Sequence, residues 1–144
     1  TTSVVGLGVG IGVSVGRTYV AYCFAEKQGY SKFSSYTGNG NTNGVFIYTG
    51  FRPAYVMFKK TTGSAGGWQV WDNKRDPDNP VENAYHPNSN NADGSPDQDI
   101  DFVSNGFKLR SNAAHLNANG VVYIYMALAE APLVGTNNVP CTAR

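Results

Sequence analysis

Aromatic side chains accompany planar polar side chains in the middle of this sequence, in a combination that suits sugar binding. Trp68 and Trp71 precede Asp72 and Arg75, and Tyr85 follows within the same stretch. A sugar offers apolar C–H faces that stack on aromatic rings and hydroxyl groups that pair with carboxylates or guanidinium. We therefore treat Trp71, Asp72, Arg75 and Tyr85 as the candidate glycan site. The alternative, which the sequence favours, is that both tryptophans pack into a core or an interface, since tryptophan is largely buried on average.

Three carboxylates, Asp97, Asp99 and Asp101, alternate along the chain after a polar stretch. Alternate residues of a strand point the same way, and Ca²⁺ takes oxygen ligands, so the three could form a calcium site. Neighbouring carboxylates are also ordinary on a solvated strand edge, and the EF-hand spacing is missing. We expect no cofactor, with calcium as the alternative.

The motifs of common enzymes do not fit their required contexts. Residues 12–16 read G-V-S-V-G, which matches a nucleophile elbow, but that motif needs a strand followed by a sharp turn and a helix. Here strand-like sequence continues on both sides. His86 and His115 are the only histidines, and neither has the spacing of a zinc site. We therefore expect a protein that is not an enzyme.

Composition limits the partners and the compartment. A net charge of +1 over 144 residues gives neither a nucleic-acid footprint nor a polybasic membrane patch. The chain opens without a signal-peptide pattern, and the apolar residues 4–15 are too few to span a bilayer. We expect Cys23 and Cys141 to be free thiols, which suits assembly in a reducing cytoplasm.

Short strands with tight turns are predicted throughout, and helix periodicity is almost absent. The clearest hairpin is residues 100–111, where Ile100 and Phe102 alternate with polar residues before Asn105-Gly106. A second hairpin turn is expected at Asn119-Gly120. Further strands are predicted at 45–48, 54–60 and 68–72, and residues 83–98 are predicted to form a long exposed loop. This spacing predicts an all-β antiparallel sandwich or jelly roll.

A sequence repeat suggests how the chain is divided. Residues 16–26 (GRTYVAYCFAE) and 120–130 (GVVYIYMALAE) share glycine, tyrosine, alanine and glutamate in the same register. We divide the chain into residues 1–26, the end of a preceding repeat, residues 27–130, a complete unit, and residues 131–144, a tail. Residues 19–25 and 123–129 are predicted to be equivalent central strands, because both are apolar on both faces.

Glycine alternates with apolar residues from 5 to 16, which predicts a strand with one bare backbone face. Glycine weakens a strand, and its repeated use indicates close approach by another surface. An assembly strand against a neighbouring identical chain and an inner strand beneath a bulky sheet are both open. We expect a homo-oligomer.

Several segments together resemble one family of phage proteins. They include YVAYCFAEKQGYSKFSSYTGNGNTNGVFIYTGFRPAYVMFKK, WQVWDNKRDPDNP, DFVSNGFKLRSN, VVYIYMALAEAP and the ending VGTNNVPCTAR. These segments, within residues 18–144, resemble a lectin-like (concanavalin-type) β-sandwich domain at the C-terminal end of virion proteins of tailed, notably marine, phages.

The resemblance implies a structural module of a tail fibre, an appendage or a capsid decoration. Its partners would be identical chains, with trimers common in fibres, and other virion proteins. It would be located in the virion and assembled in the host cytoplasm. The alternative function is a lectin-type domain that recognises host-surface glycan. The resemblance supplies no catalytic residues.

Overall fold

The computed structural model describes residues 16–62, 66–94 and 99–131. The described residues hold seven strands and no helix, so none of them forms a helix that could cross a membrane. The strands are β1 (Ser31–Thr37), β2 (Phe46–Tyr48), β3 (Pro53–Lys60), β4 (Gln69–Asp72), β5 (Ile100–Val103), β6 (Gly106–Leu109) and β7 (Val122–Ala129).

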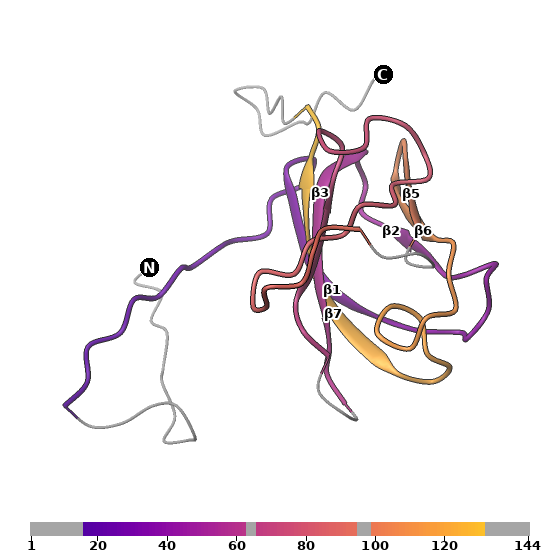
Figure 1. The fold of residues 1–144 in the computed structure, drawn as a ribbon. Helices are drawn as coiled ribbons and strands as arrows, with labels where there is room; N and C mark the ends of the chain where they lie inside the picture. The colour runs from indigo at the N-terminus through magenta and orange to yellow at the C-terminus, as the bar shows by residue number, and fades with distance from the viewer. Residues whose placement is uncertain (1–15, 63–65, 95–98, 132–144) are drawn as a thin grey trace.

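Two antiparallel sheets make up the fold. One has the strand order β1-β7-β3-β4 and the other β2-β6-β5, and the two lie in separate layers (Figure 1). The predicted all-β sandwich is confirmed. Strand β7 pairs with β1 on one side and with β3 on the other, so the predicted central position of residues 123–129 is also confirmed.

Aromatic rings fill the space between the sheets. The rings of Phe58 and Trp71 stack with centroids 4.6 Å apart, and those of Tyr36 and Tyr123 stack at 5.0 Å. Phe107 of the smaller sheet meets Tyr36 edge-on. Burial of such rings provides most of the apolar area that holds two layers together.

The hairpin over residues 100–111 forms as predicted. Strands β5 and β6 pair antiparallel, with Phe102 opposite Phe107. Gly106 lies so close to β2 that a Cβ atom there would sit 2.1 Å from the carbonyl oxygen of Ile47. This glycine is therefore required by the strand packing.

The prediction that Asn119-Gly120 forms the turn of a hairpin is wrong, because this turn does not join two paired strands. Gly120 does adopt a positive φ of 73°. However, the strands before and after it, β6 and β7, belong to different sheets. The turn ends a loop that crosses between the layers, and Gly120 donates a backbone hydrogen bond to Gly38.

The prediction of a central strand at residues 19–25 is wrong. These residues are extended and exposed, and they run away from the sandwich (Figure 1). The physical reason is that β7 already occupies the position between β1 and β3, so the segment with a similar sequence has no equivalent place in this unit. We call residues 17–25 the arm.

Strand β1, at the edge of the larger sheet, was not predicted from the sequence. β1 begins directly after the arm, at a tight turn closed by the Lys27–Ser31 bridge. Its serines weaken the apolar alternation that marks a strand. Residues 1–15 and 132–144, on which the glycine-alternating strand, the tail and Cys141 fall, lie outside the described residues. Cys23 is a free, exposed thiol, as predicted.

Candidate functional site

Trp71, one of the four residues of the predicted glycan site, is fully buried. None of its surface is exposed, and its ring stacks on Phe58 in the core. Trp68, three residues earlier, is only half-buried and lies 5.4 Å from the Lys59 ammonium group. The two tryptophans do take opposite sides, as their spacing indicates.

The structure brings the other three residues of the predicted glycan site together. The Arg75 guanidinium lies over the Tyr85 ring at 4.3 Å, and its Nε is 3.2 Å from Asp72 Oδ2. Asp72 Oδ1 also accepts hydrogen bonds from the backbone N–H groups of Lys74 and Arg75. Arg75 therefore occupies one face of the Tyr85 ring and pairs with Asp72, so these three side chains already contact one another.

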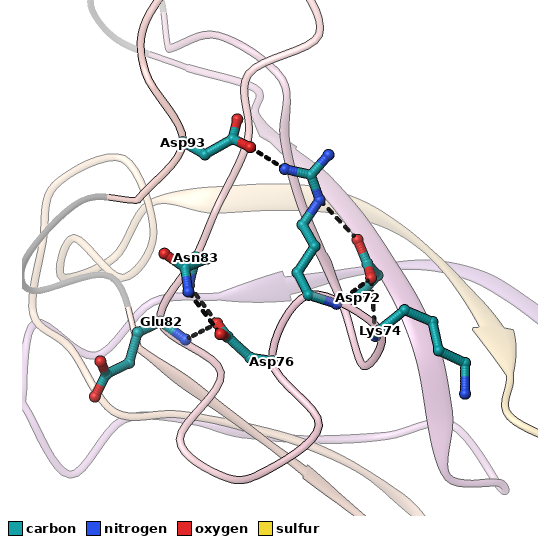
Figure 2. A network of polar contacts seen from close by, with 7 residues as sticks. Asp72, Lys74, Asp76, Glu82, Asn83 and Asp93 are labelled. Atoms are coloured by element: carbon teal, nitrogen blue, oxygen red, sulfur yellow. Dashed lines mark hydrogen bonds and ion pairs between the residues drawn. The ribbon is translucent and has the colours of Figure 1, made fainter.

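The same arginine holds the following loop in place. Arg75 also pairs with Asp93, as Figure 2 shows. Asp76 accepts hydrogen bonds from the backbone N–H groups of Glu82 and Asn83. Burial tends to raise the pKa of Asp76, but these bonds outweigh it and the pKa is lowered. Three carboxylates, of Asp72, Asp76 and Asp93, and one arginine therefore anchor the chain between residues 72 and 94.

Burial also acts on a tyrosine beside this network. Desolvation raises the pKa of Tyr55 to about 12, with smaller contributions from Tyr85 and Asp72. Tyr55 therefore remains a neutral phenol at physiological pH, which gives it no role as a base.

A pocket of about 420 Å³ lies beside this anchored loop. Its lining comes from three separate stretches: Gly66, Gly67 and Gln69; His86, Asn88, Ser89, Asn91, Ala92 and Gly94; and His115. Sequence analysis missed this site. The polar stretch 83–98 was the only signal, and nothing in the sequence places both histidines on one pocket.

Buried hydroxyl and amide groups fix the loop that carries His115. The Tyr123 hydroxyl donates to the Ala114 carbonyl at 2.8 Å, and the Tyr36 hydroxyl donates to Leu116 at 2.9 Å. Asn117 is fully buried and donates to the Ser111 carbonyl at 2.9 Å. Since each bond joins the loop to itself or to a core strand, His115 is held at the pocket by the sandwich itself.

Burial lowers the pKa of His115, and the nearby His86 and Lys60 lower it further. A neutral imidazole is therefore favoured, with one N–H donor and one acceptor nitrogen.

The alternative calcium site, formed by Asp97, Asp99 and Asp101, lies only partly within the described residues. Asp97 lies outside them, and the Asp101 carboxylate pairs with Arg110. The described residues contain no group of three or more histidine, cysteine, aspartate or glutamate side chains arranged to hold a metal ion.

The fold and the pocket define an all-β sandwich with a neutral polar pocket beside the edge strand β4. The chain belongs to the family described as "Domain of unknown function (DUF7483)", which matches residues 1–132. The match includes the arm as well as β7. No curated protein and no solved structure matches the chain.

Proposed function

We propose that this chain is a non-enzymatic structural module of a phage virion, in a tail fibre, an appendage or a capsid decoration. Its assembly with identical chains is mediated by the arm. The observation that carries the proposal is the exposure of apolar side chains there. Val20 is 78%, Tyr22 83% and Phe24 63% exposed. Large exposed apolar side chains gathered in one segment indicate an interaction site.

The sequence of the arm supports a strand-forming role. In the shared register, Tyr19 corresponds to Tyr123 and Cys23 to Ala127, both of which β7 buries completely. The arm therefore carries the residue pattern of a strand covered on both faces. It stays extended because its own unit has that position filled.

The outer edge of β1 near Ser35 is the surface we propose for the arm of a neighbouring chain, since at Ser31 and Phe33 the same edge already bonds to Lys27 and Glu26 of its own chain. β1 ends the four-stranded sheet, and its own arm leaves that edge after the Lys27–Ser31 bridge. An exposed strand edge offers unpaired backbone groups to another chain. Glu26 forms a 2.7 Å ion pair with Lys32 of β1, which holds the C-terminal end of the arm beside this edge.

Light scattering on the double variant Tyr22→Ser, Phe24→Ser tests this proposal. We expect the parent chain to be an oligomer and the variant to be a monomer. The matched control is Tyr48→Ser, Phe46→Ser, which removes the same side-chain types from exposed positions on β2. An oligomer of equal mass for all three proteins would contradict the role of the arm.

The place of the chain in a virion has its own test. Mass spectrometry of purified phage particles that encode this sequence should detect its peptides in the particle. Their absence from particles, with abundant peptides in the infected cell, would contradict the proposal.

Recognition of a glycan is the second candidate function, and a different observation favours it. The pocket is lined by uncharged hydrogen-bonding side chains, whereas Trp71 is buried and Arg75 lies over the Tyr85 ring. A glycan function would therefore depend on the pocket and not on Trp71, Asp72, Arg75 and Tyr85.

A further inference from the structure

We propose that the pocket beside β4 binds a neutral polyhydroxylated ligand, such as one residue of a saccharide. This inference deepens the second candidate function and is independent of the arm. Its volume of about 420 Å³ falls in the range of small-ligand sites, roughly 300–1,000 Å³.

The chemistry of the lining selects against ions. Its side chains are amides, a serine hydroxyl and two imidazoles, without a carboxylate, an ammonium or a guanidinium group. An anion would require positive groups and a cation would require carboxylates. Amides and a neutral imidazole offer both donors and acceptors, which matches a ligand whose hydroxyl groups do the same.

Two buried polar atoms of the lining residues lack a partner within the described residues. Gln69 is only 4% exposed, and its Oε1 has no hydrogen-bond partner; the same holds for Nε2 of His115. Buried polar atoms are nearly always hydrogen-bonded in folded proteins. Both side chains line the pocket. In our proposal, ligand hydroxyl groups supply the missing partners of these two atoms.

Hydrogen bonds within the protein fix the part of the pocket lining that Gly67 and Asn88 form. Asn88 Oδ1 accepts the backbone N–H of Trp68 at 2.7 Å, which fixes the orientation of the Asn88 amide. A Cβ at position 67 would lie 2.9 Å from Asn88 Oδ1, so the glycine allows this close approach. The Arg75–Asp93 ion pair and the Gly94–Ala84 backbone bond hold the end of the same loop. A fixed wall reduces the ordering cost of binding.

Saccharide titration followed by NMR tests the proposal. The probes are N-acetylglucosamine, galactose, mannose and rhamnose, each raised to millimolar concentration against the full chain. We expect at least one to shift the ring signals of His115 and the side-chain amide signals of Gln69 and Asn88. Gln69→Leu should weaken that binding by about tenfold, the effect of one lost hydrogen bond.

The variant is chosen so that misfolding cannot explain its effect. Leucine leaves no unpaired polar atom at this buried position, so Gln69→Leu should melt at the parent temperature or above it. Gln28→Leu makes the same change at an exposed position outside the pocket and should bind like the parent.

Two outcomes would contradict saccharide binding in the pocket. One is the absence of pocket shifts with every sugar, and the other is equal affinity of the parent and Gln69→Leu. Tighter binding of inorganic phosphate than of any sugar would overturn the neutral class of ligand. The oligomeric mass of the same samples should not change with Gln69→Leu. The test of ligand binding in the pocket is therefore separate from the test of assembly through the arm.

Discussion

Trp71 was a candidate for sugar binding by its sequence context, and the structure buries its side chain in the core. The aromatic and polar residues around it made it that candidate, although the sequence favoured a core or interface, and its ring does pack in the core against Phe58. Its strand position alone did not determine which face is inward. The pairing of Val56 with Trp71 across β3 and β4 settles this, since both side chains are fully buried.

The first prediction concerns that core stack. Replacing Trp71 by alanine should lower the free energy of unfolding by about 3–5 kcal/mol, because it removes a buried ring and leaves a cavity. Trp68→Ala is the control, and it should cost clearly less because its side chain is only half-buried. Urea denaturation of both variants makes the comparison. Equal losses would contradict the assigned faces.

The second prediction concerns His115 and pH. Its pKa is lowered in the folded state, so the unfolded chain binds the proton more readily. The stability associated with the neutral ring is present above the unfolded value near 6.5. It is lost as pH falls from there through the lower folded pKa.

Thermal melts between pH 7 and the folded pKa, compared for the parent and His115→Gln, measure this effect. The parent should lose more stability than the variant over that window. Identical pH profiles would show that burial does not shift the titration of His115.

At the scale of elements, most strands and the hairpin were predictable from the sequence. Which sheet each strand joins was not. β3, β4, β5, β6 and β7 follow from runs of apolar residues between turn signals. β1 did not, because Ser31, Ser34 and Ser35 dilute its pattern although β7 pairs with it throughout. The assignment of β6 and β7 to separate sheets depends on long-range pairing, which local sequence does not encode.

The pocket was beyond prediction for the same reason. Gln69, His86 and His115 come from different parts of the chain, and only the fold brings them to one lining. The arm illustrates the opposite case. Its sequence is that of a strand, but the described residues place it outside both sheets.

The third prediction tests an element contact. Gly106→Ala should destabilise the sandwich strongly, because the added Cβ would clash with the Ile47 backbone. Gly120→Ala is the control: its Cβ would meet open space, so only the cost of a positive φ applies, on the order of 1 kcal/mol. Differential scanning calorimetry should show the larger drop in melting temperature for Gly106→Ala. The reverse order would contradict the close β2–β6 packing.

At the scale of the whole molecule, the sandwich is closed around its aromatic core while the arm leaves apolar surface outside it. Such a molecule gains stability when a second chain covers that surface. The melting temperature of the parent should therefore rise with protein concentration. In the Tyr22→Ser, Phe24→Ser variant it should not.

Hydrogen exchange at the amides of residues 17–25 tests the central claim most directly. Isolated chains should exchange these amides as fast as an unstructured peptide, because the arm is extended and exposed. With rising concentration, we predict protection of the arm together with the outward amide of β1 at Ser35, because the amides of Ser31 and Phe33 already donate within the chain, to Lys27 and Glu26. The amides of β7 should stay protected throughout. Fast exchange of the arm at every concentration, in a chain that nevertheless forms oligomers, would contradict assembly through the arm.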